Sequence, residues 1–240
     1  MKIALVGYGR MGHEIESVAL KRGHEISLIV DIDNANDLNP EKLKSTKTDV
    51  VIEFSFPTTA FDNVRKCLEC KVPVVSGTTG WSDKFAEAEQ ICLDNDTSFI
   101  HSSNFSIGVN ILFKLNAVLA KYLENYDEYM VNVEETHHIK KLDAPSGTAI
   151  SLMDAIIANN SRFDSWSLSD NCDKRTIPVK AFREGNVPGI HTVTWDSDID
   201  TITISHEAKN RRGLALGAVV AAEYICNRKG VFTMSDVLGL

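Results

Sequence analysis

The sequence has no long hydrophobic run. The apolar stretch at its start covers only about five residues before Gly7, too few for a signal-peptide core and far below the roughly 20 of a membrane-spanning helix. No later run approaches that length. We therefore expect a cytoplasmic protein that does not associate with membranes.

Positive charge is also scarce, because 25 Lys and Arg stand against 33 Asp and Glu and the net charge is −8. This balance argues against general affinity for nucleic acid, although it allows a local basic pocket. The cysteines indicate no disulfide framework: there are five, and the CxxC pair Cys67 and Cys70 has no second pair at zinc spacing. These features suit a reducing compartment.

The N-terminus is typical of a dinucleotide site. The strand-like run Lys2–Val6 leads directly into a G-x-G-x-x-G turn, and a helical pattern follows. In that order the glycines let the backbone approach a pyrophosphate, and the first helical amides face it. The turn glycines are Gly7, Gly9 and Gly12. A second apolar run ends in Asp31, 19 positions after Gly12, where a carboxylate can bind ribose hydroxyls. An ordinary glycine-rich turn is the alternative.

Strand and helix patterns alternate through the first hundred residues, which predicts a parallel sheet covered by helices on both faces. The polar stretch from Asn34 to Thr48 breaks the pattern, and we expect an irregular connection there. After Ser106 the pattern changes to that of an open mixed or antiparallel sheet of about four strands. These strands are expected at 128–138, 176–184, 191–195 and 201–205, with helices at 109–122, 148–158 and 213–227.

We therefore predict an α/β protein with a Rossmann-like, doubly wound parallel sheet and an inserted α+β domain. Residues 1–107 plus 212–240 would form the dinucleotide-binding domain, and residues 108–211 the substrate-binding and oligomerisation domain. An exposed sheet with one apolar face needs a partner, and a second subunit would supply it. A symmetric oligomer is the expectation.

The densest polar cluster of the chain, residues 134–149, combines an anion site with an acid. Pro145 resets the backbone and Ser146 is a good N-cap, so the amides of Gly147 and Thr148 would point outward at a helix start where a carboxylate can bind. Lys140 or Lys141 would add a full positive charge. A solvated turn is the alternative for the lysines.

The same cluster contains two adjacent histidines, His137 and His138. Consecutive strand residues point to opposite faces, so only one of the two can share the cleft with the anion site. If protonated near neutral pH, that histidine can give a proton to a developing carbanion or nitrogen; otherwise it is a hydrogen-bonded strand histidine. A metal site that uses Glu134 and Glu135 is disfavoured, because consecutive strand side chains diverge.

Two loops after the fourth and fifth predicted strands could complete the nucleotide cleft. In doubly wound sheets ligands collect beyond the carboxyl ends of the strands. The amides and hydroxyls of Gly77–Gly80 and Ser103–Ser106 suit a nicotinamide amide, with plain turns as the alternative. Farther along, one of four residues that end or follow strands could meet the anion: Arg183, His191, His206 and Arg211.

These segments together resemble the bacterial 4-hydroxy-tetrahydrodipicolinate reductase (dihydrodipicolinate reductase) family over nearly the whole chain. The most specific element is E-T-H-H-I-K-K-L-D-A-P-S-G-T-A from Glu135 to Ala149, similar to the family's E-x-H-H-x-x-K-x-D-A-P-S-G-T-A. The glycine turn, Gly77–Gly80 and Asn104–Ser106 agree as well. The resemblance implies reduction of a cyclic dicarboxylate imine in lysine and diaminopimelate biosynthesis, by a homotetramer that uses NADH or NADPH and no metal.

The resemblance also assigns roles to residues. His137 would be the general acid and Lys141 its catalytic partner, while His138 and the Ser146, Gly147 and Thr148 amides would hold substrate carboxylate. Family cofactor contacts fall on Arg10, Met11, Asp31, Gly77, Thr79 and Phe105, and the loops add Thr78, Ser103 and Asn104.

Cofactor choice depends on the loop after Asp31, which lacks the arginine that often follows the acidic residue in the family. A carboxylate at this point accepts hydrogen bonds from free ribose hydroxyls and repels a 2′-phosphate. Arg10 could swing to a 2′-phosphate, so we expect use of both cofactors, with NADH at least as good as NADPH.

Two other functions are compatible with the residues. One is a non-enzymatic dinucleotide sensor that sets the state of an oligomer and needs no proton donor. The other is a different dehydrogenase of similar build that acts on an aspartate-derived carbonyl. Oxidation of NADH or NADPH in the presence of freshly generated substrate distinguishes the sensor from the enzymes.

Overall fold

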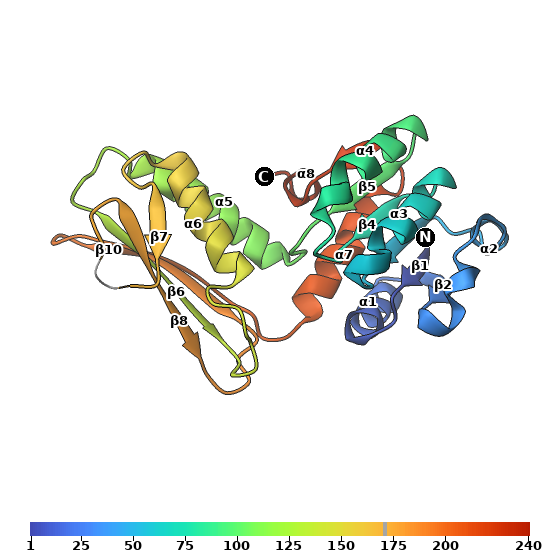
Figure 1. Ribbon diagram of the computed structural model, residues 1–240, viewed down its shortest axis with the longest axis horizontal. Helices are drawn as coiled ribbons and strands as arrows, with labels where there is room; N and C mark the ends of the chain where they lie inside the picture. The colour runs from blue at the N-terminus through green and yellow to red at the C-terminus, as the bar shows by residue number, and fades with distance from the viewer. Residues whose placement is uncertain (170–171) are drawn as a thin grey trace. The chain divides into compact units, whose positions relative to one another are not determined.

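The computed structural model describes residues 1–169 and 172–240, which form two compact units. The first unit comprises Met1–Ile107 and Arg211–Leu240, and the second comprises Gly108–Asn210. Figure 1 labels their helices and strands. Among the described residues, no helix is both long and apolar enough to cross a membrane.

The first unit is built on a six-stranded sheet in which every pairing is parallel. The strands are β1 (Lys2–Val6), β2 (Glu25–Val30), β3 (Val50–Glu53), β4 (Val74–Ser76), β5 (Ser98–His101) and β11 (Gly230–Phe232). Their spatial order is β11-β5-β4-β3-β1-β2. The chain changes direction across the sheet between β1 and β3, and ligands of open α/β sheets bind beyond the carboxyl ends at such a point.

Helices cover both faces of this sheet (Figure 1). Helices α1 (Arg10–Lys21) and α7 (Arg212–Ile225) pack against Ile3 and Leu5, whereas α3 (Pro57–Glu69) and α4 (Phe85–Asp94) share the other core with Ala4 and Val6. Successive strand residues point to opposite faces, so the uninterrupted apolar run of β1 serves both cores. The short elements are η1 (Ile32–Asp37), α2 (Pro40–Ser45), η2 (Ser82–Lys84) and α8 (Met234–Leu238).

The second unit carries a mixed sheet of five strands in the order β10-β9-β6-β8-β7. The strands are β6 (Met130–His137), β7 (Ser165–Ser167), β8 (Thr176–Arg183), β9 (Ile190–Asp196) and β10 (Thr201–Glu207). β6 pairs parallel with β8 and antiparallel with β9. At the two edges of the sheet, β7 runs parallel to β8 and β10 runs antiparallel to β9.

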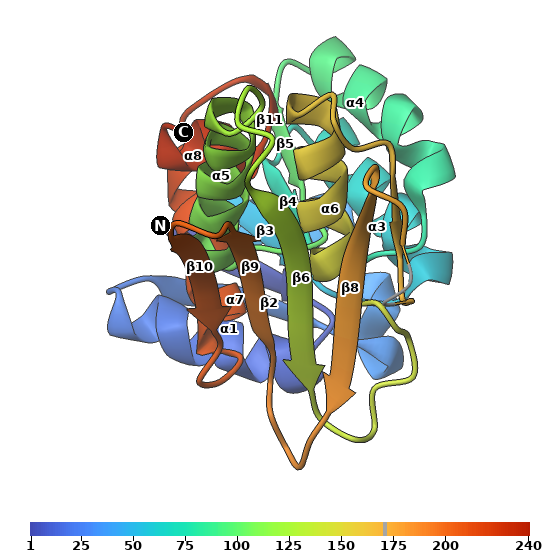
Figure 2. The same cartoon turned by 90° about the vertical axis from the view of Figure 1, so that its left-hand side faces the viewer.

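Two helices, α5 (Ile107–Tyr122) and α6 (Gly147–Asn159), cover the inner face of this sheet, as Figure 2 shows. The buried side chain of Asn116 joins them, because its Nδ2 donates to the carbonyl of Leu152 at 2.8 Å. The outer face is largely polar and rich in threonine. Its side chains include Asn132, Glu134, Thr136, Lys180, Phe182, Thr192, Thr194 and Thr203.

The predicted doubly wound parallel sheet with an inserted mixed-sheet domain is confirmed. Three local expectations need correction. The stretch 34–48 contains parts of η1 and the helix α2, the second sheet has a fifth strand, β7, and the last helix is followed by β11 and α8. Both missed strands are only three residues long, too short to produce a periodic pattern.

Candidate active site

The glycine turn joins β1 to α1, and two of its three glycines, Gly7 and Gly12, lie where no Cβ fits. Gly7 has φ +88°, and a Cβ built there would lie 2.0 Å from the carbonyl oxygen of Phe54. At Gly12 a Cβ would lie 2.5 Å from the carbonyl oxygen of Gly7. The turn is therefore packed against β3 and α1 with backbone alone, as close approach to a pyrophosphate requires.

A cleft of about 560 Å³ opens beside this turn at the carboxyl ends of β1, β2 and β3. It brings together most of the predicted cofactor residues: Gly7, Gly9, Arg10, Met11, Asp31, Gly77, Thr78 and Thr79. Phe54, Ser55, Phe56 and Arg211 line it as well. The turn, an acidic residue and two cations thus share one concave surface, which fits a dinucleotide that carries both phosphates and ribose hydroxyls.

The remaining predicted cofactor residues do not line the cleft. Gly12 is buried behind the turn, and Ser103 and Asn104 lie outside the cleft lining. The Phe105 side chain is 1 % exposed and packs in the core with its ring centroid 5.9 Å from that of Phe54. Any contact between Phe105 and a cofactor would therefore involve its backbone.

A buried carboxylate, Glu53 at the end of β3, connects two of the loops around the cleft. It accepts hydrogen bonds from the Ser55 amide at 2.9 Å, the Ser76 hydroxyl at 2.6 Å and the Thr78 hydroxyl at 2.8 Å. The Ser55 hydroxyl also donates to it. Sequence reasoning missed Glu53, because it looked like part of an apolar strand and two of its partners, Ser76 and Thr78, lie at the end of β4.

Asp31 follows β2 on the surface of the same cleft. Its N–H donates to Asn34 Oδ1 at 2.7 Å, and Asn34 Nδ2 donates to the carbonyl of Ile29 at 2.9 Å. The Asn34 side chain thus holds the backbone at Asp31. Arg10 and Arg211 line both this cleft and a neighbouring one of about 430 Å³ that also contains Lys21 and Arg212.

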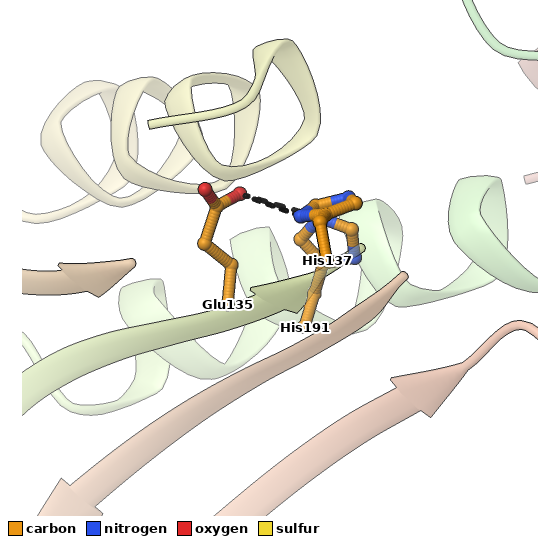
Figure 3. Close-up of side chains that lie close together, drawn as sticks. All are labelled: Glu135, His137 and His191. Atoms are coloured by element: carbon orange, nitrogen blue, oxygen red, sulfur yellow. Dashed lines mark ion pairs between the residues drawn. The ribbon is translucent and has the colours of Figure 1, made fainter. Parts of the chain in front are cut away.

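The second unit concentrates its polar groups at the end of β6. Along this strand Val131, Val133, Glu135 and His137 are buried on the inner face, and the intervening residues are more exposed. Figure 3 shows Glu135 and His137 on β6 with His191 on the neighbouring β9. The strand period therefore selects His137 for the inner face, while His138 begins the loop that follows.

Glu135 lies at the centre of this cluster with no exposed side-chain surface. Its two oxygens accept the Ser146 N–H at 3.1 and 3.0 Å, and Arg183 Nη2 approaches one of them at 3.3 Å. His137 Nδ1 lies 3.5 Å from the other oxygen, and His191 Nε2 lies 3.8 Å from it. A buried carboxylate needs such partners, because its desolvation is otherwise costly.

Burial holds His137 and His191 in their neutral forms. Desolvation is the main cause that lowers the His137 pKa below its ordinary value. The positive charges of Lys141 and Arg183 lower this pKa further, whereas the negative charges of Glu135 and Asp143 raise it. The pKa of His191 falls to about 4, again mainly through burial and then through the charge of His137. The substrate-free chain therefore favours the unprotonated form of His137.

The loop after β6 carries the predicted substrate residues. Lys141 Nζ pairs with the Asp143 carboxylate at 2.7 and 2.8 Å, and this ammonium lowers the Asp143 pKa. Arg183 binds the loop, because its Nη2 donates to the carbonyl of Asp143 at 2.6 Å. The loop ends at α6, where the predicted N-cap Ser146 accepts the Ala149 N–H at 3.2 Å and contacts His191 Nε2 at 3.2 Å.

Glu135, His137 and His191 also satisfy the spacing of a metal site, since their ligand atoms lie within 4.8 Å of one another. The surrounding charges oppose a cation there. Arg183 already occupies one oxygen of Glu135, and Lys141 adds positive charge near His137. The arrangement favours a network of charged and hydrogen-bonded groups.

Comparison with known proteins finds matches in both units of the chain. Residues 1–105 match the family model "Dihydrodipicolinate reductase, N-terminus", and residues 108–238 match "Dihydrodipicolinate reductase, C-terminus". A 4-hydroxy-tetrahydrodipicolinate reductase of Christiangramia forsetii is 50% identical over 238 residues, 99% of this chain and 98% of that protein. The chain belongs to the dihydrodipicolinate reductase family. Its predicted identity as an NAD(P)H-dependent oxidoreductase is thereby confirmed.

More distant members of the family and solved structures agree. A 4-hydroxy-tetrahydrodipicolinate reductase of Methanocaldococcus jannaschii is 34% identical, covering 92% of this chain and 84% of that protein. A dipicolinate-bound dihydrodipicolinate reductase from Paenisporosarcina sp. TG-14 shares the fold, with TM-score 0.81, 22% identity and 97% of both chains covered. Aspartate semialdehyde dehydrogenase II from Vibrio cholerae has TM-score 0.56 at 12% identity, covering 92% of this chain and 97% of that one. The family membership therefore favours the reductase over the sensor and over another dehydrogenase.

Three functional candidates of this reductase were missed or left undecided by the sequence. Glu135 was considered only within the motif and as a ligand of a disfavoured metal site, and Arg183 and His191 were two of four residues that could meet an anion. The strand alternation Val131, Val133, Glu135, His137 could have indicated that Glu135 shares the face of His137. Its contacts with β8 and β9 depend on strand register, which the sequence does not show.

Proposed function

We propose that this reductase binds NADH or NADPH in the cleft of the first unit and reduces a cyclic imine dicarboxylate held by the loop between β6 and α6, acting as a 4-hydroxy-tetrahydrodipicolinate reductase. The observation that carries the proposal is the gathering of His137 and a capped helix start around Glu135, with the Lys141 ammonium in the loop that joins them. These groups combine a proton donor with sites for anionic oxygens.

The cofactor cleft supports the first half of the proposal. The residues that would hold the pyrophosphate are the turn glycines and the first amides of α1, and those that would contact the adenosine ribose include Asp31. Gly77, Thr78 and Thr79 would contact the nicotinamide end. When bound, the reduced dinucleotide supplies the hydride.

Substrate carboxylates would bind where the loop enters α6. The Ser146 amide, predicted as a contact, already donates to Glu135. The proposed contacts are therefore His138, the Ser146 hydroxyl and the amides of Gly147 and Thr148. Lys141 is proposed to exchange its ion pair with Asp143 for a substrate carboxylate. Each charge-assisted contact orients the ring, and the orientation contributes to the rate as well as to affinity.

His137 is the proposed proton donor, and we propose that its ring takes up the proton when substrate binds. In the free chain burial disfavours its protonated form. A dianionic substrate brings negative charge close to the imidazole and raises its pKa, so that proton uptake accompanies binding. The proton then passes from the ring to the substrate as hydride adds, and His137 returns to its neutral state.

Two further properties are proposed for the whole enzyme. A homotetramer would cover the outer face of the second unit's sheet, where Phe182 is 48% exposed among threonines. A cytoplasmic location agrees with the five free cysteines.

The test is oxidation of both cofactors, followed at the nicotinamide absorbance, with freshly generated substrate. The proposal predicts turnover with NADH and with NADPH and none without substrate. Absence of turnover with either cofactor, in a chain that still binds NADH, would contradict the reductase and support a sensor.

Cofactor preference has its own measurement, kcat/KM for each cofactor at one ionic strength in the wild type and in Asp31→Asn. We predict NADH at least as good as NADPH, because Asp31 repels a 2′-phosphate, and a shift toward NADPH in the variant. A wild type that favours NADPH more than tenfold, about 1.4 kcal/mol, together with an unchanged ratio in Asp31→Asn, would refute the ribose role of Asp31.

A further inference from the structure

The Glu135 carboxylate contacts both the proposed acid, His137, and the start of α6, where the substrate carboxylates are proposed to bind. It accepts the Ser146 N–H immediately before α6 and faces His137 Nδ1 at 3.5 Å. Arg183, which also holds the loop through Asp143, reaches its other oxygen at 3.3 Å. Because the Glu135 side chain is fully buried, these contacts are made without competition from water.

The Glu135 carboxylate lies beside one nitrogen of the His137 ring. This nitrogen, Nδ1, is 3.5 Å from Glu135 Oε2. It is buried and has no hydrogen-bond partner among the described residues, so the carboxylate is the acidic group placed nearest to it. Nε2 is turned toward Gly189, where a built Cβ would lie 3.0 Å from it. A partner at one ring nitrogen decides which nitrogen carries the proton in the neutral form and fixes the orientation of the other.

We infer that Glu135 is a positioning residue for the proposed reduction: it keeps His137 Nδ1 turned inward, leaves Nε2 as the atom that exchanges a proton with substrate, and supplies the negative charge that offsets Arg183. The inference rests on the proposed function for the identity of the substrate. The geometry itself is present in the free chain.

The charges that act on His137 come from every element packed around it. Glu135 on β6 and Asp143 in the loop favour the protonated ring, whereas Arg183 on β8 and Lys141 in the loop oppose it. His191 on β9 is the nearest neutral neighbour, with ring centroids 5.0 Å apart, and His206 on β10 pairs in register with His191. Glu135 and Arg183 therefore form one ion pair with opposite effects on the same histidine.

This opposition provides the experiment, a comparison of Glu135→Gln with Arg183→Gln. Both substitutions break the same ion pair and retain a hydrogen-bonding group; Gln is close in size to Glu, whereas it is shorter than Arg. A general acid must be protonated, so kcat falls as pH rises through the pKa of His137 in the complex. We expect this alkaline limb to move to lower pH by about one unit or more in Glu135→Gln, and to higher pH in Arg183→Gln. A purely structural ion pair would give both variants the same change.

Glu135→Asp separates orientation from charge. It keeps the carboxylate but withdraws it from the ring, so kcat is expected to fall while the alkaline limb stays nearer the wild-type pH than in Glu135→Gln. NADH affinity, measured by the fluorescence of the bound nicotinamide, is the control for folding and should stay within about twofold in all three variants. The inference is overturned if the alkaline limb of the kcat–pH profile does not shift, or if it shifts in the same direction in Glu135→Gln and Arg183→Gln.

The proposed function and the inference fail in different ways. If the wild type does not reduce the substrate, the function is wrong, and the titration of His137 in the free chain then decides the inference. Nitrogen-15 spectra of histidine-labelled protein report this titration, with the His137 signals assigned by their loss in His137→Gln. Opposite shifts of the titration midpoint in the two variants would support the positioning role, and equal or absent shifts would refute it.

Discussion

At the residue scale, the free chain holds its reactive groups in resting states. Burial keeps His137 neutral, and Lys141 is paired with Asp143. In the proposed mechanism both resting states end when a dianionic substrate binds, because it attracts a proton to the imidazole and competes with Asp143 for the ammonium. The protein thus avoids a buried uncompensated charge in the absence of substrate, which would cost folding free energy.

His137→Gln tests the proton donor. We expect kcat to fall by roughly 10²–10⁴, the usual contribution of general acid catalysis, while the NADH dissociation constant changes by no more than a few-fold. Steady-state turnover and fluorescence titration of NADH measure the two effects. Turnover at the wild-type rate would remove His137 from the mechanism.

Lys141→Ala should lose a comparable part of kcat and also raise KM for the substrate, since it removes positive charge from the proposed carboxylate site. Asp143→Ala is the matched control, because it frees the Lys141 ammonium from its partner at 2.7 Å without removing it. Substrate KM should fall or stay constant in that variant. An equal rise of KM in both variants would indicate that the ion pair only supports the loop.

At the element scale, α7 packs against the loop that follows β5 with backbone on backbone. A Cβ at Gly217 would lie 1.6 Å from the carbonyl oxygen of Phe105, whereas the nearest atom to a Cβ at Gly213 is the Ser106 hydroxyl oxygen at 3.6 Å. Both glycines lie in the same helix, where alanine is favoured by up to about 1 kcal/mol. Only the space around them differs.

We therefore predict that Gly217→Ala lowers the free energy of unfolding by about 1–3 kcal/mol, the usual cost of overpacking a core. Gly213→Ala should be neutral or slightly stabilising. Denaturant unfolding followed by circular dichroism measures both variants. Equal stability of the two would show that α7 can move away from the loop at little cost.

The elements show how far sequence reasoning reached. The strand β1 and the helices beside it were predictable, because a buried parallel strand is an unbroken apolar run and helical periodicity follows it. The glycine turn and the N-cap Ser146 were predictable for the same local reason. The pairing of Glu135 with Arg183 was not, because 48 positions separate them and only the β6–β8 register brings them together.

At the scale of the whole molecule, the outer face of the second unit's sheet is the surface that a symmetric oligomer would use. β-branched threonines fill much of this face, and Phe182 on β8 lies in register with Thr136 on β6. Threonine side chains pack well on a second pleated surface, and Glu134 and Lys180, which pair in register on the same face, carry opposite charges. Phe182 has a large apolar area to bury there.

Phe182→Asp is accordingly expected to dissociate the proposed tetramer, because the new carboxylates would be buried without partners. Leu93→Asp is the control: Leu93 is 57% exposed on α4, which belongs to the first unit. Sedimentation equilibrium should give the wild type and the control four times the chain mass of 26.5 kDa, and the Phe182 variant a smaller species. A wild type that sediments as a single chain, or a Phe182 variant that stays tetrameric, would exclude this face as the interface.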